Sequence, residues 1–235
     1  MQIESAAVIF DVDGVLLELT RAEEDAFFVP FERRYGLKDI SRDWNSYAIR
    51  NDENIIAEIL ERHGIPSHER SEVSADYLNV LKQQLENGSI KTIVVPGTRE
   101  LLEKLHNTTQ LGIATANFLS AAKLRLESQS LWYYVSNLAS GAEGGGHKRE
   151  ILARAIASTS LPKSSIVYVG DNLNDVEAGL SNGVHFIGFS INQERLKDLK
   201  HAGATHMSNN HLETFRLISH LLRGRIAENI KRANS

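Results

Sequence analysis

Short apolar segments alternate with amphipathic helical segments after Pro96-Gly97, and this alternation constrains the fold more than any other feature of the chain. The pattern predicts strands over residues 111–115, 165–169 and 185–189, and a weaker strand over 133–136. It predicts helices over residues 100–106, 120–128, 148–158, 175–181, 195–201 and 212–230. A further apolar run, residues 6–10, predicts a buried strand near the N-terminus. Strands that are joined through helices pair in parallel and are covered on both faces, so we expect an α/β fold with a doubly wound parallel sheet.

Residues 20–87 contain no convincing strand, and their apolar residues recur at helical spacing. Helices are predicted over residues 21–35, with Pro30 as a kink or boundary, over 52–63 and over 71–86. Because this stretch interrupts the alternating pattern, we expect a core formed by residues 1–15 and 93–235 and an inserted helical domain formed by residues 16–92.

The charge distribution agrees with this division. The inserted segment holds 15 acidic and 10 basic side chains, whereas the remainder holds 15 acidic and 16 basic ones. Two amphipathic units with differently charged solvated surfaces would give the same numbers, so the difference alone does not identify a binding surface.

Composition excludes several classes of protein. The 235 residues include no cysteine, which excludes disulfides, thiolate metal sites and a cysteine nucleophile. The net charge of −4 disfavours a nucleic-acid-binding protein. No apolar run is long enough to span a membrane, and Met1–Ser5 lacks the features of a signal peptide. We therefore expect a cytoplasmic enzyme, monomeric or homodimeric, with no nucleic-acid or membrane partner.

Polar residues follow the predicted strands at the points where a parallel sheet places its ligand site. Asp11 and Asp13 follow the first strand, and Gly14 permits a turn there. Thr115 ends the second strand, and Asn117 follows it. Two further elements carry the remaining candidates, namely the helix opened by Lys148 after the glycine-rich residues 141–146 and the segment Gly170–Asp175, which contributes Asp171 and Asp175.

These residue types together favour phosphoryl transfer. Several carboxylates near one another repel unless a cation is present, and oxygen ligands select a hard cation such as Mg²⁺. A carboxylate nucleophile suits a reaction through an aspartyl-phosphate, with a hydroxyl and a lysine binding the phosphate oxygens. Each motif alone has a simpler interpretation, such as a loop, a strand-end hydroxyl, a solvated lysine or a capped turn. Their order, spacing and strand context favour the joint interpretation.

Other sites are disfavoured by spacing. Gly141 and Gly146 have the separation of a P-loop, but His147 stands where its lysine belongs, and neither a P-loop nor a dinucleotide-binding glycine motif is expected. His201, His206 and His211 recur every five residues, which does not place them on one helix face, so we do not expect a histidine metal site.

The motifs resemble those of the haloacid dehalogenase-like hydrolase superfamily. Its Asp-x-Asp, Ser/Thr, Lys and Gly-Asp-x-x-x-Asp motifs correspond in order to Asp11 and Asp13, to Thr115, to Lys148, and to Asp171 and Asp175. The resemblance covers nearly the whole chain, and Val95-Pro96-Gly97 is similar to phosphoglycolate phosphatase-like members. It implies a Rossmann-like core with an inserted α-helical cap domain.

The resemblance also implies a role for each residue. Asp11 would be the nucleophile and a Mg²⁺ ligand, and Asp13 would be the general acid and base, with its carbonyl on the metal. Asp171 would be a second carboxylate ligand, and Asp175 would orient metal-bound water or Lys148. Thr115 and Lys148 would hold the phosphoryl group. The remaining phosphate-binding or substrate-binding candidates are Gly14, Ala116, Asn117 and Arg50.

Some positions depart from the family pattern or leave alternatives open. Val15 stands where many members have threonine, and no proline follows Lys148, so Arg149 is an alternative phosphate ligand. Polar and aromatic residues between the first two cap helices either reach the substrate or form a solvated loop; they are Lys38, Arg42, Trp44, Tyr47 and Arg50.

The function that the sequence supports best is a Mg²⁺-dependent phosphatase acting on a small phosphorylated metabolite. Related alternatives are a phosphosugar mutase, which needs a cap histidine that is absent before His63, and a phosphonate hydrolase, for which Lys38 is the nearest cap lysine. Dehalogenation is disfavoured because Asp13 is retained. A non-catalytic phosphate-binding protein on the same fold is the alternative from another class.

Overall fold

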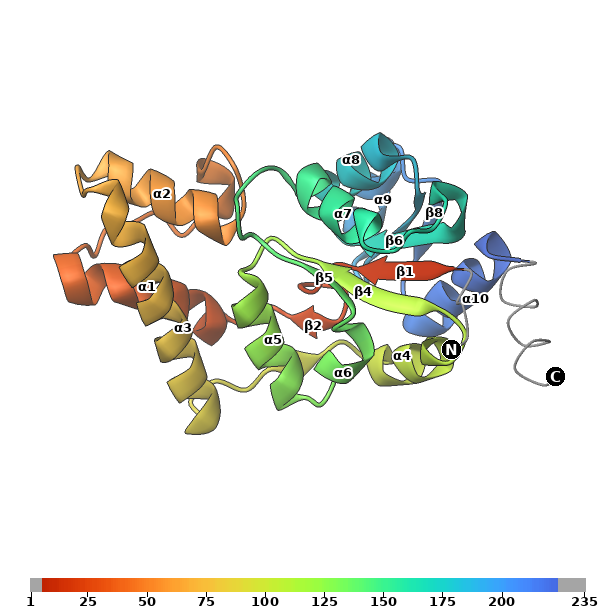
Figure 1. Cartoon of the computed structure of the whole chain (residues 1–235), viewed down its shortest axis with the longest axis horizontal. Coiled ribbons are helices and arrows are strands. Elements are labelled where there is room, and N and C mark those ends of the chain that lie inside the picture. The colour runs from red at the N-terminus through yellow and green to blue at the C-terminus, as the bar shows by residue number, and fades with distance from the viewer. Residues whose placement is uncertain (1–5, 224–235) are drawn as a thin grey trace.

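A computed structural model describes residues 6–223 as an α/β protein with a six-stranded parallel sheet, in agreement with the predicted fold class (Figure 1). In spatial order the strands are β5 (Leu138–Ser140), β4 (Gln110–Ala114), β1 (Ala7–Phe10), β6 (Ile166–Gly170), β7 (His185–Phe189) and β8 (His206–Ser208). The central strand β1 pairs with β4 on one side and with β6 on the other. The segments that follow these three strands therefore meet at one edge of the sheet.

Both faces of the sheet are buried, which explains why its strands are continuously apolar. In β1, Val8 and Phe10 pack into the cluster on one face, whereas Ala7 and Ile9 pack into the cluster on the other. One face is covered by α4 (Thr98–His106), α5 (Leu119–Ser128), α6 (Trp132–Val135) and α10 (His211–Leu221). The opposite face is covered by α7 (Lys148–Ala157), α8 (Leu173–Asn182) and α9 (Gln193–His201). The remaining short helix, Lys163–Ser165, leads into β6.

A separate helical unit lies beyond the carboxyl end of β1, at the left of Figure 1. It consists of α1 (Arg21–Tyr35), α2 (Asp52–Arg62) and α3 (Arg70–Glu86), with the single turns Trp44–Ser46 and Ser67–Glu69. Its own apolar cluster includes Phe27, Phe31, Ile56, Ile59 and Leu81. A small antiparallel pair, β2 (Leu17–Glu18) and β3 (Ile93–Val94), joins both ends of the unit to the core.

Local residues define where the helices of this unit begin and end. Thr20 and Glu23 form a capping box at the start of α1, and Gly36 ends the helix with φ 69°. Pro30 is buried inside α1, so the helix continues through the position where we expected a kink or a boundary. Asn51 caps α2 through a hydrogen bond from the Asn54 amide, and Asp52 is the first residue of that helix.

Two expectations about individual elements need correction or fall partly outside the described residues. The strand predicted over residues 133–136 is wrong: Trp132–Val135 is helix α6, and the strand that pairs with β4 is Leu138–Ser140. Aromatic residues favour strands, but here Tyr133 lies 70% exposed on a surface helix. The helix predicted over 212–230 is observed as His211–Leu221, and its predicted part from residue 224 onward lies outside the described residues. Within residues 6–223, no helix has the length and apolarity needed to cross a bilayer.

Candidate active site

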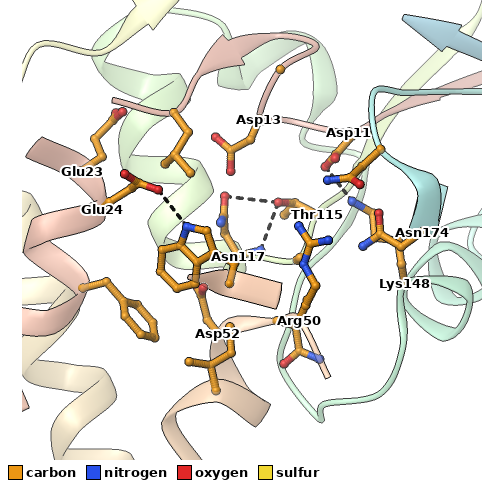
Figure 2. Close-up of a pocket in the computed structure, with 18 of the residues that line it drawn as sticks. Asp11, Asp13, Glu23, Glu24, Arg50, Asp52, Thr115, Asn117, Lys148 and Asn174 are labelled. Carbon is orange, nitrogen blue, oxygen red and sulfur yellow. Dashed lines mark hydrogen bonds and ion pairs between the residues drawn. The ribbon is translucent and has the colours of Figure 1, made fainter. Parts of the chain in front are cut away.

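A cavity of about 370 Å³ lies between the carboxyl ends of the strands and the helical unit. Its core side is formed by the segments after β1, β4 and β6 and by the start of α7. The helical unit provides the opposite wall. Of the candidate residues predicted from the sequence, those that line the cavity are Asp11, Asp13, Gly14, Trp44, Arg50, Thr115, Ala116, Asn117, Lys148 and Asp171. Figure 2 shows how Asp11, Asp13, Arg50, Thr115, Asn117 and Lys148 lie. The fold therefore gathers residues that are far apart in the sequence into one cavity.

Asp11 lies directly after β1, where its amide continues the sheet by donating to Val169 O. Its Oδ1 lies 2.7 Å from Lys148 Nζ and also accepts from the Val12 amide at 2.7 Å. Burial raises the pKa of Asp11 well above its usual value, although the nearby Lys148 charge opposes the shift. Asp11 is thus a desolvated carboxylate with a fixed orientation.

Lys148 is buried at the first position of α7 and contacts two carboxylates. Its Nζ lies 2.7 Å from Asp11 Oδ1 and 3.1 Å from Asp175 Oδ1. Burial alone would lower the pKa of Lys148, but the attraction of Asp11 and Asp175 outweighs burial and raises it. The sequence left Lys148 and Arg149 as alternatives. Arg149 lies outside the cavity and pairs with Glu150 and Glu177 on the surface.

Carboxylate oxygens of Asp11, Asp171 and Asp175 lie within 4.8 Å of one another. Burial, together with the charge of Asp175, raises the pKa of Asp171 to about 7. Such crowding of buried acids is relieved by a cation, and the all-oxygen donor set suits a hard divalent ion such as Mg²⁺. The residues present therefore fit the metal that the resemblance implies.

Asp175 differs from the other two acids because its oxygens already have donors. Oδ1 accepts from the Tyr168 hydroxyl at 2.6 Å and faces Lys148, while Oδ2 accepts from the Asp171 and Asn172 amides. Asp175 is fully buried behind the cavity wall. Its observed contacts fix Lys148 and the backbone of the segment that carries Asp171.

Gly14 allows Asp171 to approach the segment after β1. Its φ is 75°, and a Cβ at this position would lie 2.3 Å from Asp171 Oδ2. Any side chain would therefore displace that carboxylate. The requirement for glycine here is steric as well as conformational.

Thr115 and Asn117 form a small hydrogen-bonded turn after β4. The Thr115 hydroxyl accepts from the Asn117 amide at 3.1 Å and donates to Asn117 Oδ1 at 3.3 Å. Thr115 continues the strand by donating its own amide to Ser140 O. This arrangement holds the hydroxyl at the cavity, which Ala116 and Asn117 also line.

Arg125 is a site residue that sequence reasoning missed. It lies on α5 with its side chain 3% exposed, and its guanidinium pairs at 2.8 Å with Asp13 Oδ1 and at 2.8 Å with Glu23 Oε1. Burial alone would lower the pKa of Arg125, but Asp13 and Glu23 raise it. One feature of the sequence could have identified Arg125. It lies on the same helix face as the apolar residues Ala122 and Leu126, and a cation buried on such a face requires carboxylate partners.

The start of α2 is bonded to the core loops. Phe118 donates its amide to Asp52 Oδ2 at 2.7 Å, and Asp52 donates its own amide to Ala116 O at 2.9 Å. Asn51 Nδ2 donates to Gly146 O at 2.6 Å. These bonds tie the helical unit to the loops that carry Thr115 and Lys148.

Two of the five substrate-contact candidates from the helical unit line the cavity, Trp44 and Arg50. The Arg50 guanidinium points toward Thr115 and Lys148, and its Nε has no hydrogen-bond partner within residues 6–223 (Figure 2). Lys38 is exposed, Arg42 pairs with Asp25, and Tyr47 is buried in the helical unit with its hydroxyl donating to Ser41 O. These three residues do not line the cavity.

Comparisons with known proteins agree with this fold. Residues 8–189 match the family model described as haloacid dehalogenase-like hydrolase. No match to a curated protein was found. A predicted phosphatase from Clostridium acetobutylicum is 20% identical with a TM-score of 0.67, over 92% of this chain and 99% of that one.

Two other solved structures show the same fold. A provisionally assigned phosphoglycolate phosphatase from Lactobacillus plantarum is 18% identical with a TM-score of 0.65, over 92% of this chain and 100% of that one. A provisionally assigned β-phosphoglucomutase from Bacteroides vulgatus is 18% identical with a TM-score of 0.67, over 96% of this chain and 91% of that one. At these identities the likeness concerns the fold and does not distinguish among the activities.

Proposed function

Because the chain belongs to the haloacid dehalogenase-like hydrolase family, we propose that it is a Mg²⁺-dependent phosphatase that hydrolyses a small-molecule phosphate monoester through an aspartyl-phosphate intermediate. One observation carries the proposal. The buried Asp11 carboxylate lies 2.7 Å from Lys148 Nζ at the end of the central strand, and Asp13, Thr115 and Asp171 line the same cavity. This combination supplies a nucleophile, phosphate ligands and an acidic cluster in one place.

The proposed reaction has two steps. A carboxylate oxygen of Asp11 attacks phosphorus, the bond to the ester oxygen breaks, and Asp13 gives a proton to the departing alcohol. Asp13 then takes a proton from water as that water attacks the aspartyl-phosphate, which releases inorganic phosphate and regenerates Asp11. Lys148 and the Thr115 hydroxyl hold the phosphoryl oxygens, with Gly14, Ala116, Asn117 and Arg50 beside them.

The proposed metal site uses the acidic cluster. Asp11 and Asp171 would hold Mg²⁺ together with the main-chain carbonyl of Asp13. Asp175 lies outside the cavity lining and would hold Lys148 and the Asp171 backbone in position. When bound, the ion would offset the negative charge of the transferring phosphoryl group.

We further propose that residues 16–92 act as a cap that excludes water during the reaction. The bonds from Asn51 and Asp52 to the core loops support this role, because they bring the helical unit against the cavity. The β2–β3 pair would be the connection about which the unit moves.

The cavity favours a phosphatase over the two related activities. Among the described residues that line it there is no histidine, and Lys148 is the only lysine. A phosphosugar mutase would need the cap histidine, and a phosphonate hydrolase would need a cap lysine, whereas Lys38 is exposed and outside the cavity. A non-catalytic phosphate-binding protein would bind phosphate and Mg²⁺ without turnover.

The deciding experiment is hydrolysis of a generic aryl phosphate with and without Mg²⁺. We expect Mg²⁺-dependent turnover that falls by about 10³-fold or more in Asp11→Asn, because the amide cannot form the covalent intermediate. Asp198→Asn, at an exposed position of α9, is the matched control and is expected to keep full activity. Unchanged turnover in Asp11→Asn would contradict the proposed mechanism.

A further inference from the structure

Asp52 is a buried carboxylate in the cavity that the proposed reaction does not use. It is 6% exposed, and its Oδ2 accepts from the Phe118 amide at 2.7 Å. Its Oδ1 has no hydrogen-bond or ion-pair partner among residues 6–223, and the residue lines the cavity. Burial raises the pKa of Asp52 to about 7. Oδ1 is not one of the fully buried unpaired atoms, so it is accessible from the cavity, and a ligand that places a positive charge there would pair with the carboxylate.

Aromatic rings and a second carboxylate surround this position. Phe27, Trp44 and Tyr77 line the cavity together with Glu24. The Phe27 ring centroid lies 5.5 Å from that of Trp44 and 5.1 Å from that of Tyr77, so the three rings form one wall. Trp44 Nε1 donates to Glu24 Oε1 at 2.8 Å, which fixes the indole. Aromatic faces beside carboxylates attract organic cations through the ring quadrupole and through charge.

The two cations that line the cavity lie apart from the acids Glu24 and Asp52 of the helical unit. Figure 2 shows the cations Arg50 and Lys148 on one side, next to Asp11 and Thr115, and the acids Glu24 and Asp52 on the other. Asp13 lies above them in that view, and its charge acts on Asp52. In the proposed reaction the alcohol departs toward Asp13. The substituent on that alcohol would therefore extend toward Asp52 and the aromatic wall.

We propose that the substrate is a phosphate monoester whose alcohol carries a cationic nitrogen, a primary or quaternary ammonium, which binds between Asp52, Glu24 and the aromatic wall. This inference rests on the proposed phosphatase function and names its substrate class. The phosphate occupies the side with Arg50 and Lys148, and the ammonium occupies the acidic side. Electrostatic complementarity then selects the orientation in which the ester oxygen faces Asp13.

The test compares substrates that differ only in charge. Phosphocholine is paired with 3,3-dimethylbutyl phosphate, in which carbon replaces the quaternary nitrogen. Phosphoethanolamine is paired with propyl phosphate, in which a methyl group replaces the ammonium. We expect the protein to favour the cationic member of at least one pair by about tenfold or more in kcat/KM, and the pair that shows the preference identifies the type of ammonium.

Asp52→Asn isolates the contribution of the charge, because asparagine keeps an oxygen that accepts from the Phe118 amide. We expect the preference to fall to about twofold or less in this variant, measured as the ratio of kcat/KM within each pair. Hydrolysis of an aryl phosphate without a cationic group, measured on the same variant, separates loss of the preference from a general loss of activity. Glu53→Gln is the matched control, because it removes the same charge from the adjacent residue. Glu53 pairs with Arg70 away from the cavity, so its variant should keep the preference.

Three outcomes would overturn the inference. If the aryl phosphate is hydrolysed but neither cationic substrate is preferred over its isostere, the substrate class is wrong and the phosphatase function stands. If the preference exists but is equal in Asp52→Asn and the wild type, Asp52 does not bind the ammonium. Absence of any Mg²⁺-dependent hydrolysis, the aryl phosphate included, would refute the phosphatase function and with it this inference.

Discussion

Lys148 and Arg149 are consecutive residues of α7, yet Lys148 is buried and Arg149 lies on the surface. His147 precedes α7, so Lys148 and Arg149 are its first two residues and differ by about 100° around the axis. Lys148 is directed between Asp11 and Asp175, and Arg149 is directed toward Glu150 and Glu177. The sequence offers both residues as phosphate ligands. It does not show which of them faces the cavity, because the orientation of α7 about its axis is set by the packing of its apolar face.

We expect Lys148→Met to lower aryl phosphatase activity by about 100-fold or more, because the phosphoryl group loses its buried cation. Arg149→Met should change kcat/KM by less than about twofold. Steady-state kinetics with saturating Mg²⁺ compare the two variants. Equal losses in both variants would contradict the assignment of the phosphate ligand to Lys148.

His211 is a buried neutral imidazole that links α10 to the segment after β1. Its Nε2 lies 2.9 Å from Val15 O and 3.1 Å from Thr98 Oγ1, and its ring stacks on Phe189. Nδ1 is buried and has no hydrogen-bond partner in the described part of the chain, so a second ring proton would have no acceptor. Burial accordingly lowers the pKa of His211 to about 4.

This shift predicts a loss of stability in acid. The unfolded chain takes up the His211 proton near its ordinary pKa of about 6.5, whereas the native state takes it up only near pH 4. Native stability from this residue is therefore complete above about pH 6.5 and falls by up to about 3 kcal/mol as the pH drops to 4. Urea unfolding at pH 7.5 and 5 should show the wild type losing more stability than His211→Gln. If the free energy of unfolding falls by the same amount in the wild type and in His211→Gln, His211 is not the source of the loss.

At the scale of elements, Arg125 joins α5 to both connections of the helical unit. Its guanidinium pairs with Asp13 and with Glu23 of α1, and Glu23 Oε1 also accepts from the Thr92 hydroxyl beside β3. The ends of the inserted unit are thus held by one buried ionic network. The sequence predicted the insertion from periodicity, but a network across more than 100 residues of sequence has no local signal.

We expect Arg125→Met to destabilise the fold by about 3 to 5 kcal/mol, because it leaves the buried Glu23 carboxylate without a counter-charge. The double variant Glu23→Gln/Arg125→Met should lose less than the sum of the single variants, since the two groups interact directly. Chemical denaturation measures all three. Arg99→Met, at an exposed arginine on α4, serves as the control and should change stability by no more than about 0.5 kcal/mol. Strict additivity would argue against the network.

The secondary structure predicted from sequence was most accurate where burial dictates the pattern. The strands 6–10, 111–115, 165–169 and 185–189 are buried on both faces, and each was placed to within about one residue. The failures are short elements with weak patterns, namely the two-residue strands β2 and β3, the edge strands β5 and β8 and the helix α6. Such elements form because neighbouring segments pair with them or support them, so their own residues do not specify them.

At the scale of the whole molecule, part of the acidic excess of residues 16–92 lies at the cavity. Glu18, Glu23, Glu24 and Asp52 belong to that segment and line the cavity, opposite the acidic cluster of the core. Carboxylates thus converge on the cavity from both units, and Arg50, Lys148 and Arg125 balance only some of them. The total charge of residues 16–92 can be counted from the sequence. Which of these carboxylates line the cavity depends on how the helical unit packs against the sheet. An unbalanced cavity of this kind should be stabilised by a bound divalent cation.

We therefore expect Mg²⁺ to raise the melting temperature of the protein. A ligand present at 100 times its Kd stabilises a native state by about 2.7 kcal/mol, which corresponds to about 5 to 10 °C for a chain of this size. Differential scanning calorimetry with and without Mg²⁺ measures the shift, with Na⁺ at equal ionic strength as the control. Asp171→Asn should remove most of the shift because it deletes a carboxylate of the cluster, whereas Asp198→Asn, at an exposed position of α9, should keep it. An equal shift in Asp171→Asn and the wild type would place the stabilising ion elsewhere on the molecule, and no shift in the wild type would refute the metal site itself.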